Sequence, residues 1–202
     1  MLDSFIRPYI NPPLRQIGER AFESGLTANM VTVVGFIIGM IGCVAIGLQA
    51  YSVGLVLLLI NRFLDGLDGA ISHHGTRTDF GAYIDTIMDY TVYGAFALFF
   101  AMGSPIHALA TSFLLFSLIG IASTSLGLVA MKLKAQSASS PLNTGPRSQY
   151  MMSGLVGDAE IIIFIILACF FPVAFSALAA ILGVMCWITT VGRILEAKNL
   201  LG

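Results

Sequence analysis

The segment 30–49 carries no charged side chain and is long enough to cross a lipid bilayer as a helix. A spanning helix needs about 20 mostly apolar residues. Only 10% of the chain is charged and 57% is hydrophobic, whereas a soluble domain usually carries roughly 25% charged residues. We therefore predict an all-α membrane domain over residues 26–202. Its six transmembrane helices are expected at 30–49, 52–73, 79–102, 107–131, 154–172 and 174–195.

The first 25 residues differ from the rest. Apolar residues recur there at helical spacing between charged ones such as Arg7, Glu19 and Arg20, and Pro12 and Pro13 interrupt the pattern. We predict a broken amphipathic helix that lies on the membrane surface. Because the first apolar run begins only near Met30, no cleavable signal peptide is expected.

Basic residues indicate how the helices are oriented. The connections near 50–52, 103–107 and 171–176 contain no Lys or Arg. The N-terminal segment and the other connections contain Arg7, Arg15, Arg20, Arg77, Lys132, Lys134 and Arg147. The positive-inside rule then places both termini, and the polar connection 135–149, in the cytoplasm.

Small residues have a packing interpretation. Gly35, Gly39 and Gly42 give the first span a narrow face that permits close contact with a neighbouring helix. The three cysteines, Cys43, Cys169 and Cys186, all lie in apolar stretches. We expect them to be small core residues, since nothing in their spacing indicates a disulfide framework or a metal site.

Four aspartates sit where the second and third spans adjoin. Asp65 and Asp68 are three residues apart, and Asp85 and Asp89 are four apart, so each pair shares one face of its helix. The two helices are consecutive and joined by a short turn, so they should be antiparallel neighbours whose acidic faces meet. A charge at bilayer depth costs about 3 kcal/mol on insertion scales, and such residues normally mark function.

Four carboxylates in one place would repel each other strongly, so either some of them stay protonated or a cation neutralises them. Oxygen ligands suit a hard divalent ion, Mg²⁺ above all, with Mn²⁺ or Ca²⁺ as alternatives. Two such ions about 4 Å apart are a standard device for phosphoryl displacement. Gly66, Gly69 and Gly81 lie on or near the acidic faces and would leave room for a bulky ligand.

Two other interpretations of the acids stay open. They can be interfacial residues at helix ends, exposed to lipid headgroups. They can also form the cation or proton path of a transporter, although no inverted repeat is visible and the acids gather at one end of the spans.

The aspartates also resemble a known signature. The order is Asp65, two residues, Asp68-Gly69, eleven residues, Gly81, three residues, Asp85, three residues and Asp89. This resembles the motif of the CDP-alcohol phosphotransferase family, and Asn29 and Thr32 resemble that family's Asn-x-x-Thr segment at the entry to the first span. The chain is similar to small bacterial inner-membrane members whose reaction is not assigned, and the resemblance covers nearly its whole length.

The resemblance implies an enzyme of phospholipid biosynthesis. It would move a phosphatidyl group from a CDP-linked donor, usually CDP-diacylglycerol, to an alcohol and release CMP. Asp65, Asp68 and Asp85 would bind two ions, Mg²⁺ or Mn²⁺, and Asp89 would be the general base while also touching a metal. The implied donor-binding residues are Asn29, Thr32, Asp65, Gly69, His73, Arg77 and Gly81. A homodimer in the bacterial inner membrane is implied as well.

One departure from the family pattern stands beside the motif. The family usually has Ala-Arg where this chain has Ser72 and His73. Histidine supplies a smaller and pH-dependent charge. Either Arg77, one helical turn further on, takes the place of that arginine, or donor binding is weakened or altered. The second case would make the chain a CDP-lipid-binding relative with weak turnover.

Basic residues on the same membrane face are candidates for binding the acceptor. Lys132, Lys134 and Arg193 could receive an acceptor that carries phosphate, and the alternative is positive-inside charge in contact with anionic lipid. Asp158 and Glu160 either contact the acceptor or simply favour a helix N-terminus. The formal net charge is −1 and basic residues form no run, so no nucleic-acid partner is expected.

Overall fold

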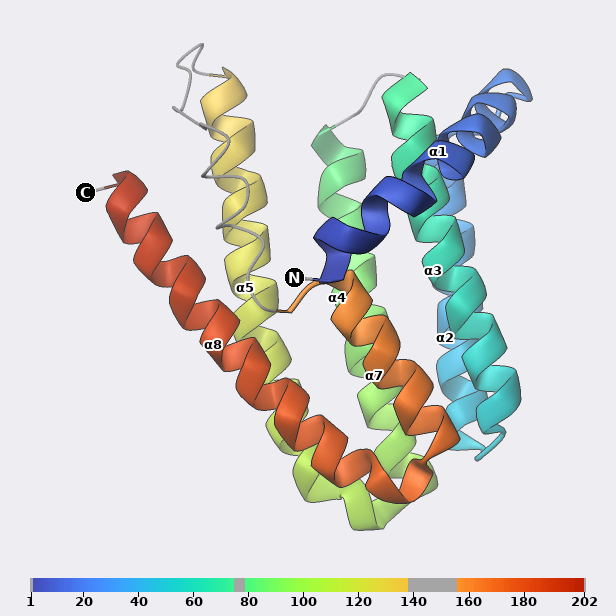
Figure 1. The fold of residues 1–202 in the computed structure, drawn as a ribbon, viewed down its shortest axis with the longest axis vertical. Helices are drawn as coiled ribbons and strands as arrows, with labels where there is room; N and C mark the ends of the chain where they lie inside the picture. Colours follow the sequence, from blue (N-terminus) through green and yellow to red (C-terminus); the bar gives the residue numbers. More distant parts are fainter. Residues whose placement is uncertain (1, 75–78, 138–155, 202) are drawn as a thin grey trace.

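A computed structural model describes residues 2–74, 79–137 and 156–201 of the chain. Over this part the protein is built from α-helices and two single 3₁₀ turns, with no strand (Figure 1). The elements are α1 (Leu2–Glu23), α2 (Ala28–Gly47), α3 (Tyr51–His74), α4 (Asp79–Gly103), η1 (Pro105–His107), α5 (Ala108–Ser137), α7 (Asp158–Phe170), η2 (Pro172–Ala174) and α8 (Phe175–Leu201).

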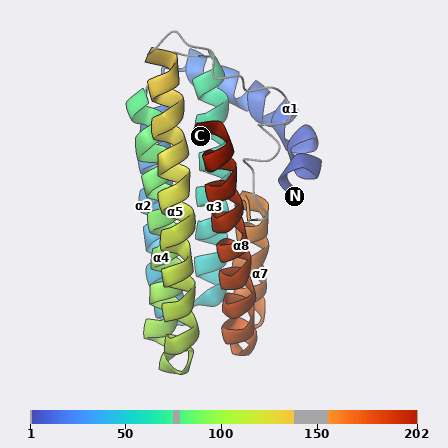
Figure 2. The same cartoon turned by 90° about the vertical axis from the view of Figure 1, so that its left-hand side faces the viewer.

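Each of the six predicted spans coincides with one helix, from α2 to α8. The long helices run roughly side by side, and α1 lies across one end of them (Figures 1 and 2). The turn predicted near Phe171 is present, because α7 ends at Phe170 and α8 begins at Phe175. The connection expected at 135–149 begins later than predicted, since α5 continues to Ser137. The rest of that connection lies outside the described residues.

Four stretches in the described part of the chain are long and apolar enough to cross a membrane: Ala28–Gly47, Phe80–Gly103, Pro105–Gly127 and Pro172–Leu195. The helix α3 does not qualify, because its second half carries Arg62, Asp65 and Asp68. The 13 residues of α7 rise only about 20 Å, which is shorter than a bilayer core of about 30 Å. The count of six spans therefore stays a prediction.

The prediction of a broken N-terminal helix is wrong, because α1 is continuous through Pro12 and Pro13. A few residues after the prolines, α1 packs against α3. A Cβ at Gly18 would lie 2.8 Å from Ala70 Cβ and 3.1 Å from the carbonyl carbon of Ala70, so the two backbones are in close contact there. Proline has no backbone N–H to donate, so Pro12 and Pro13 weaken the helix locally. The contact with α3 stabilises the half of α1 that follows them.

The glycine face of α2 packs against α3, as its spacing permits. Gly35, Gly39 and Gly42 are all buried. A Cβ at Gly39 would lie 3.0 Å from the Asn61 side chain, and one at Gly42 would lie 3.1 Å from Leu57 Cβ. This face is therefore used within the chain, and it brings α2 against the helix that carries the first two aspartates.

The other end of the bundle is closed by aromatic rings. Phe100 and Phe175 stack with their centroids 3.9 Å apart, and Phe96 and Phe164 pack beside them. His107 is buried at this end, where its Nδ1 lies 2.7 Å from Ser176 Oγ. The three cysteines are buried and unpaired, as predicted. The four aspartates lie toward the opposite end of the bundle, where α3 ends and α4 begins.

Candidate active site

Three of the four aspartates converge between α3 and α4. Asp65, Asp68 and Asp85 each offer a carboxylate oxygen, and these oxygens all lie within 4.8 Å of one another. We call these three residues the acid trio. The helices α3 and α4 run antiparallel (Figure 1), but they make little direct contact, because α2 packs against both of them. The prediction that the two helices are neighbours is therefore wrong, whereas the prediction that the two acidic faces meet is confirmed for Asp65, Asp68 and Asp85.

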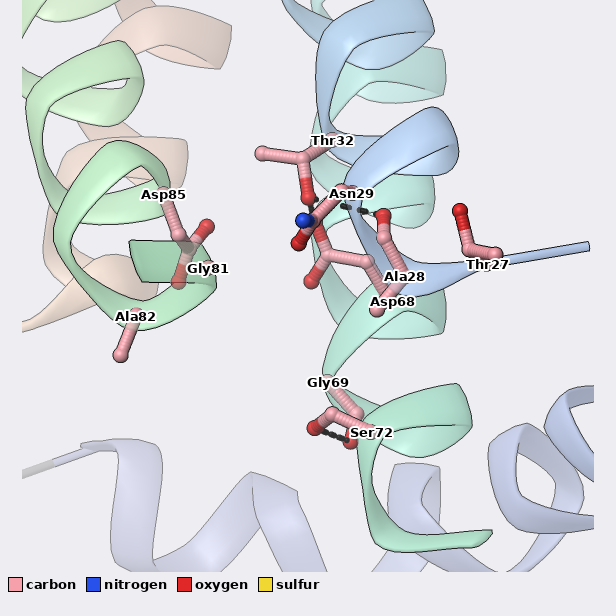
Figure 3. A pocket seen from close by; sticks show the side chains of 10 residues that line it. All are labelled: Thr27, Ala28, Asn29, Thr32, Asp68, Gly69, Ser72, Gly81, Ala82 and Asp85. Atoms are coloured by element: carbon pink, nitrogen blue, oxygen red, sulfur yellow. Dashed lines mark hydrogen bonds between the residues drawn. The ribbon is translucent and has the colours of Figure 1, made fainter. Parts of the chain in front are cut away.

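A cavity of about 260 Å³ opens beside the trio. Figure 3 shows that its walls come from the start of α2, the second half of α3 and the start of α4. Four residues that the sequence assigned to the donor line it: Asn29, Thr32, Gly69 and Gly81. The complete lining is Thr27, Ala28, Asn29, Thr32, Asp68, Gly69, Ser72, Gly81, Ala82 and Asp85.

The start of α2 is fixed at the rim of this cavity. The Thr27 hydroxyl caps the helix by accepting from the Met30 backbone N–H at 3.3 Å. One turn later, the Thr32 hydroxyl donates to Asp68 Oδ2 at 2.5 Å, which orients that buried carboxylate. A side chain expected to face the nucleotide therefore also positions one member of the trio.

The donor set fits a hard divalent cation. All three groups of the trio are carboxylates, the oxygen ligands that Mg²⁺ and Mn²⁺ prefer. Asp85 Oδ1 is buried and has no hydrogen-bond partner among the described residues, which is costly unless something else fills that role. Two unit charges 4 Å apart repel by about 4 kcal/mol at an effective dielectric of 20, so a cation here would relieve a substantial strain.

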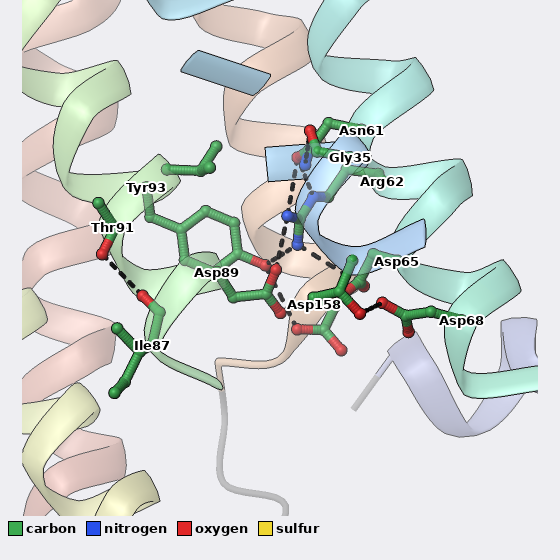
Figure 4. A network of polar contacts seen from close by, with 12 residues as sticks. Gly35, Asn61, Arg62, Asp65, Asp68, Ile87, Asp89, Thr91, Tyr93 and Asp158 are labelled. Atoms are coloured by element: carbon green, nitrogen blue, oxygen red, sulfur yellow. Dashed lines mark hydrogen bonds and ion pairs between the residues drawn. The ribbon is translucent and has the colours of Figure 1, made fainter. Parts of the chain in front are cut away.

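Asp89 has a different environment. Its Oδ1 accepts a hydrogen bond from Arg62 Nη2 at 2.7 Å, and both side chains are largely buried. Arg62 also approaches Asp65, with Nη1 3.7 Å from Oδ2. Figure 4 shows the guanidinium, which comes from α3, reaching Asp89 of α4 and Asp65 of α3. The fourth aspartate is therefore paired with an internal cation.

The Arg62 guanidinium is held by neighbours on two helices. It donates to Asn61 Oδ1 from Nε at 2.9 Å and from Nη2 at 2.8 Å, and to the Tyr93 hydroxyl at 2.6 Å. The Asn61 amide in turn donates to the Gly35 carbonyl at 2.9 Å. Arg62 and Tyr93 were not among the predicted site residues. Their spacing could have revealed them, because Arg62 precedes Asp65 by three residues and Tyr93 follows Asp89 by four, so each shares a helix face with an aspartate.

Several predicted binding residues are only partly described. His73 lies within α3, and Lys132 and Lys134 lie within α5, but the structure does not describe their side chains. Arg77 falls between the described ranges. Ser72, which stands in the family's alanine position, is described: it lines the cavity and donates to the Gly69 carbonyl at 2.7 Å.

Arg193 points inward, between α8 and α5. Its Nη1 donates to Ser125 Oγ at 2.6 Å, and Ser125 Oγ lies 2.7 Å from the Tyr90 hydroxyl. Its Nε is buried without a hydrogen-bond partner in the part of the chain that the structure describes. The cation is therefore inside the bundle, next to the helix that carries Asp85 and Asp89.

Asp158 and Glu160 separate into two roles. The Glu160 carboxylate accepts from the Gly157 N–H at 2.9 Å, which is a helix-start contact. The Asp158 carboxylate instead receives the Tyr93 hydroxyl at 3.5 Å and belongs to the polar network of Figure 4. The helix-start interpretation thus describes Glu160 better than Asp158.

The three glycines expected to leave room for a ligand do not all face the cavity. Gly69 and Gly81 line it. A Cβ at Gly66 would lie 2.8 Å from Leu14 Cδ2, so α1 already occupies the space beside that residue. The expectation for Gly66 is wrong, because the sequence did not reveal which helix covers that face of α3.

The sequence matches a known family over most of its length. The family model for CDP-alcohol phosphatidyltransferase matches residues 25–193. The chain is 36% identical over 195 residues to the inner membrane protein YnjF of Escherichia coli strain K12, covering 96% of this chain and 94% of that protein. It is 28% identical over 197 residues to the archaetidylinositol phosphate synthase of Pyrococcus horikoshii, covering 97% and 96%.

Solved structures share the fold. The phosphatidylinositol phosphate synthase PgsA1 of Mycobacterium tuberculosis with CDP-DAG bound has a TM-score of 0.70 and 21% identity, covering 94% of this chain and 96% of that one. The same protein in complex with manganese and citrate has a TM-score of 0.69. The described helices thus share their fold with a protein crystallised with CDP-DAG bound.

Proposed function

The chain belongs to the CDP-alcohol phosphatidyltransferase family, and we propose that it transfers a phosphatidyl group from CDP-diacylglycerol to an alcohol with release of CMP. The observation that carries this proposal is the acid trio, two members of which, Asp68 and Asp85, line a cavity of about 260 Å³. Within the cavity, Asn29, Thr32, Gly69 and Gly81 would contact the nucleotide and diphosphate of the donor.

The reaction needs one new bond, one broken bond and one proton transfer. The acceptor oxygen forms a bond to the phosphorus that carries the lipid. The bond from this phosphorus to the oxygen that bridges the two phosphates breaks, and CMP leaves with that oxygen. The acceptor proton passes to Asp89, the carboxylate beside the trio. A carboxylate can serve here because it needs to accept the proton only as the new P–O bond forms.

Divalent cations are part of the proposal. Asp65, Asp68 and Asp85 would hold Mg²⁺ or Mn²⁺, with two ions as the expected complement. When bound, the ions neutralise the charge on the donor's phosphates. The chain's own contribution is to orient Asp68 through Thr32 and to present the buried, unpartnered Asp85 Oδ1 to the ion.

The membrane arrangement follows from the same assignment. We propose six spans in the bacterial inner membrane, both termini and the cavity on the cytoplasmic side, α1 on the membrane surface, and a homodimer. Arg193 is the described candidate for an acceptor phosphate, because its Nε is buried and has no hydrogen-bond partner within residues 2–74, 79–137 and 156–201. Lys132 and Lys134 remain candidates from the sequence.

The test is CMP release by purified protein in lipid, with radiolabelled CDP-diacylglycerol, Mg²⁺ and a panel of alcohols that includes glycerol 3-phosphate and inositol phosphate. We expect metal-dependent release of CMP that falls by about 10²–10⁴-fold in Asp89→Asn, the range typical for loss of a general base. Glu23→Gln, on the exposed side of α1, is the matched control. If no acceptor supports CMP release, the proposed function is wrong.

A further inference from the structure

Ser72 brings a hydroxyl group to the wall of the cavity, at a position where the family usually has alanine. The residue is half-buried in the last part of α3, and Figure 3 shows its side chain at the cavity, across from Ala82 of α4. The carboxylate oxygens that lie within 4.8 Å of one another belong to Asp65, Asp68 and Asp85. The Ser72 hydroxyl is not one of these oxygens, so it is available for another part of a ligand.

The Ser72 hydroxyl already uses its single proton inside the protein. It donates to the Gly69 carbonyl at 2.7 Å, a normal length for an O–H···O bond. A hydroxyl has one hydrogen to donate and two lone pairs that accept. The oxygen therefore offers lone pairs to the cavity and favours a ligand group that donates a hydrogen bond. A phosphate oxygen, which only accepts, is disfavoured at this point.

The position of Ser72 along α3 indicates which part of a nucleotide lies beside it. Ser72 follows Asp68 by four residues, which is a rise of about 6 Å along the helix. If the phosphates lie at the acid trio, the next group of a nucleotide is the ribose, and the base lies further out. The space between is open, because the Cβ position of Gly69 has no atom of a described residue within 4 Å. The hydrogen-bond donors of the ribose are its 2′- and 3′-hydroxyls.

The same local hydrogen bond occurs elsewhere without a cavity. Serine in a helix can return its proton to a backbone carbonyl about one turn back. The exposed Ser112 of α5 does so with the Ala108 carbonyl at 2.9 Å. The two serines differ in their surroundings, because only Ser72 of the pair lines the cavity of about 260 Å³. Ser112 is therefore a matched control for a purely local role of the hydroxyl.

We propose that Ser72 is a specificity residue for the sugar of the donor, and that its hydroxyl oxygen accepts a hydrogen bond from a ribose hydroxyl. The inference rests on the proposed function, because it takes a CDP-linked lipid as the donor. It adds that this chain prefers the ribonucleotide form of that donor to a deoxyribonucleotide form. The preference can be measured by nucleotide binding, without any turnover.

The experiment is isothermal titration calorimetry of the purified full chain in micelles with saturating Mn²⁺. The probes are CMP, 2′-deoxy-CMP, 3′-deoxy-CMP and UMP. The proteins are the parent chain, Ser72→Ala, Ser72→Thr and the control Ser112→Ala. Ser72→Ala introduces the residue usual in the family, and thermal unfolding of each variant reports any change in the fold. The kcat/KM for CDP-diacylglycerol and for its 2′-deoxy counterpart is the second readout.

We expect the parent chain to bind CMP about 3–10-fold more tightly than the deoxy analogue that lacks the recognised hydroxyl, the range for one net hydrogen bond. Ser72→Ala should bind CMP as weakly as the parent binds that analogue, and the two losses should not add. Ser72→Thr keeps a hydroxyl that can donate to a carbonyl one turn back, so it should retain the preference. Ser112→Ala should behave as the parent does.

Four results would overturn the proposal. Equal affinity of the parent for CMP and both deoxy analogues would mean that no ribose hydroxyl is recognised. A preference that survives in Ser72→Ala would assign the recognition to another residue. A preference for CMP over UMP that disappears in Ser72→Ala, with the sugar preference intact, would assign Ser72 to the base. Failure of the parent to bind CMP would remove the ligand itself. If CMP binds and no acceptor supports CMP release, the proposed function fails, and the binding data still decide the role of Ser72.

Discussion

Gly66 and Gly69 lie three residues apart on α3, yet the space beside them differs. A Cβ at Gly66 would lie 2.8 Å from Leu14 Cδ2 of α1, whereas a Cβ at Gly69 would have no neighbour within 4 Å among the residues that the structure describes. Gly69 lines the cavity together with Asp68 and Ser72. One face of α3 therefore docks α1, and we call it the docking face. The face that carries the acids and the cavity lining is the cavity face.

The difference shows that the glycines of one motif can have two functions, close helix packing at one position and space for a ligand at another. The docking face fixes the position of α3 through close helix contact at Gly66 and at Ala70, opposite Gly18. The cavity face keeps empty space beside carboxylates, which suits a ligand with phosphates and a metal. Bulky substitutions on the docking face should lower stability, and substitutions of the acids on the cavity face should change binding and turnover.

The largest effect is expected from Asp68→Asn on the cavity face. Asparagine keeps an oxygen that can accept from the Thr32 hydroxyl, so the local fold is retained while one metal ligand loses its charge. Losing a partner of a metal ligand typically costs 10–100-fold, so we expect the ligand itself to cost about 100-fold or more in Mn²⁺ affinity and CMP release. Mn²⁺ titration and thermal unfolding in micelles check this, with Glu19→Gln on α1 as control.

Asp68→Asn would break the comparison if it lowered the unfolding temperature as much as a substitution on the docking face. It also contrasts with Asp89→Asn, which should lose turnover through the missing base while it weakens Mn²⁺ binding less than Asp68→Asn does. If both variants lost Mn²⁺ binding to the same degree, Asp89 would be a metal ligand like the members of the trio.

The next effect in size is expected from Gly18→Leu, which targets the docking face from α1. The Cβ alone would lie 2.8 Å from Ala70 Cβ and 3.1 Å from the Ala70 carbonyl carbon, so the helices must separate. Overpacking of this kind costs about 1–3 kcal/mol. We expect a lower unfolding temperature and faster trypsin cleavage at Arg15 and Arg20, which are exposed on α1.

Gly127→Leu is the matched control for that prediction. Gly127 is an exposed helical glycine on α5 with no atom within 4 Å of its Cβ position. It should leave the unfolding temperature unchanged or slightly higher, since leucine favours a helix more than glycine does. A fall of equal size in both variants would mean that the contact between α1 and α3 contributes little.

The sequence predicted the parts of this fold that depend on residues close together in the chain. Apolar runs located the helices from α2 to α8, and spacings of three and four residues placed Asp65 with Asp68 and Asp85 with Asp89. The short link between their helices was enough to predict that the pairs meet. The cavity lining by Asn29 and Gly81 came from the family resemblance.

The parts that the sequence did not predict depend on which helix covers a given face. Spacing alone could not reveal that Leu14 fills the space at Gly66. Nor could it show that Tyr93 and Asn61 would fix Arg62 against Asp89. The two prolines of α1 were expected to break the helix because their local cost is about 3 kcal/mol each, and the docking on α3 that offsets this cost involves residues some fifty positions away.

The smallest effect compares the two glycines directly, through Gly69→Ala and Gly66→Ala. Both are helical, and alanine is favoured over glycine in a helix by about 1 kcal/mol. At Gly69 the new methyl group meets nothing within 4 Å, so we expect the unfolding free energy to rise by about that amount. At Gly66 the methyl displaces Leu14 Cδ2, the end of a flexible side chain, so the gain should be smaller. Equal gains in chemical unfolding would show that Leu14 is not seated on Gly66, and the docking face would then reduce to the contact at Gly18 and Ala70.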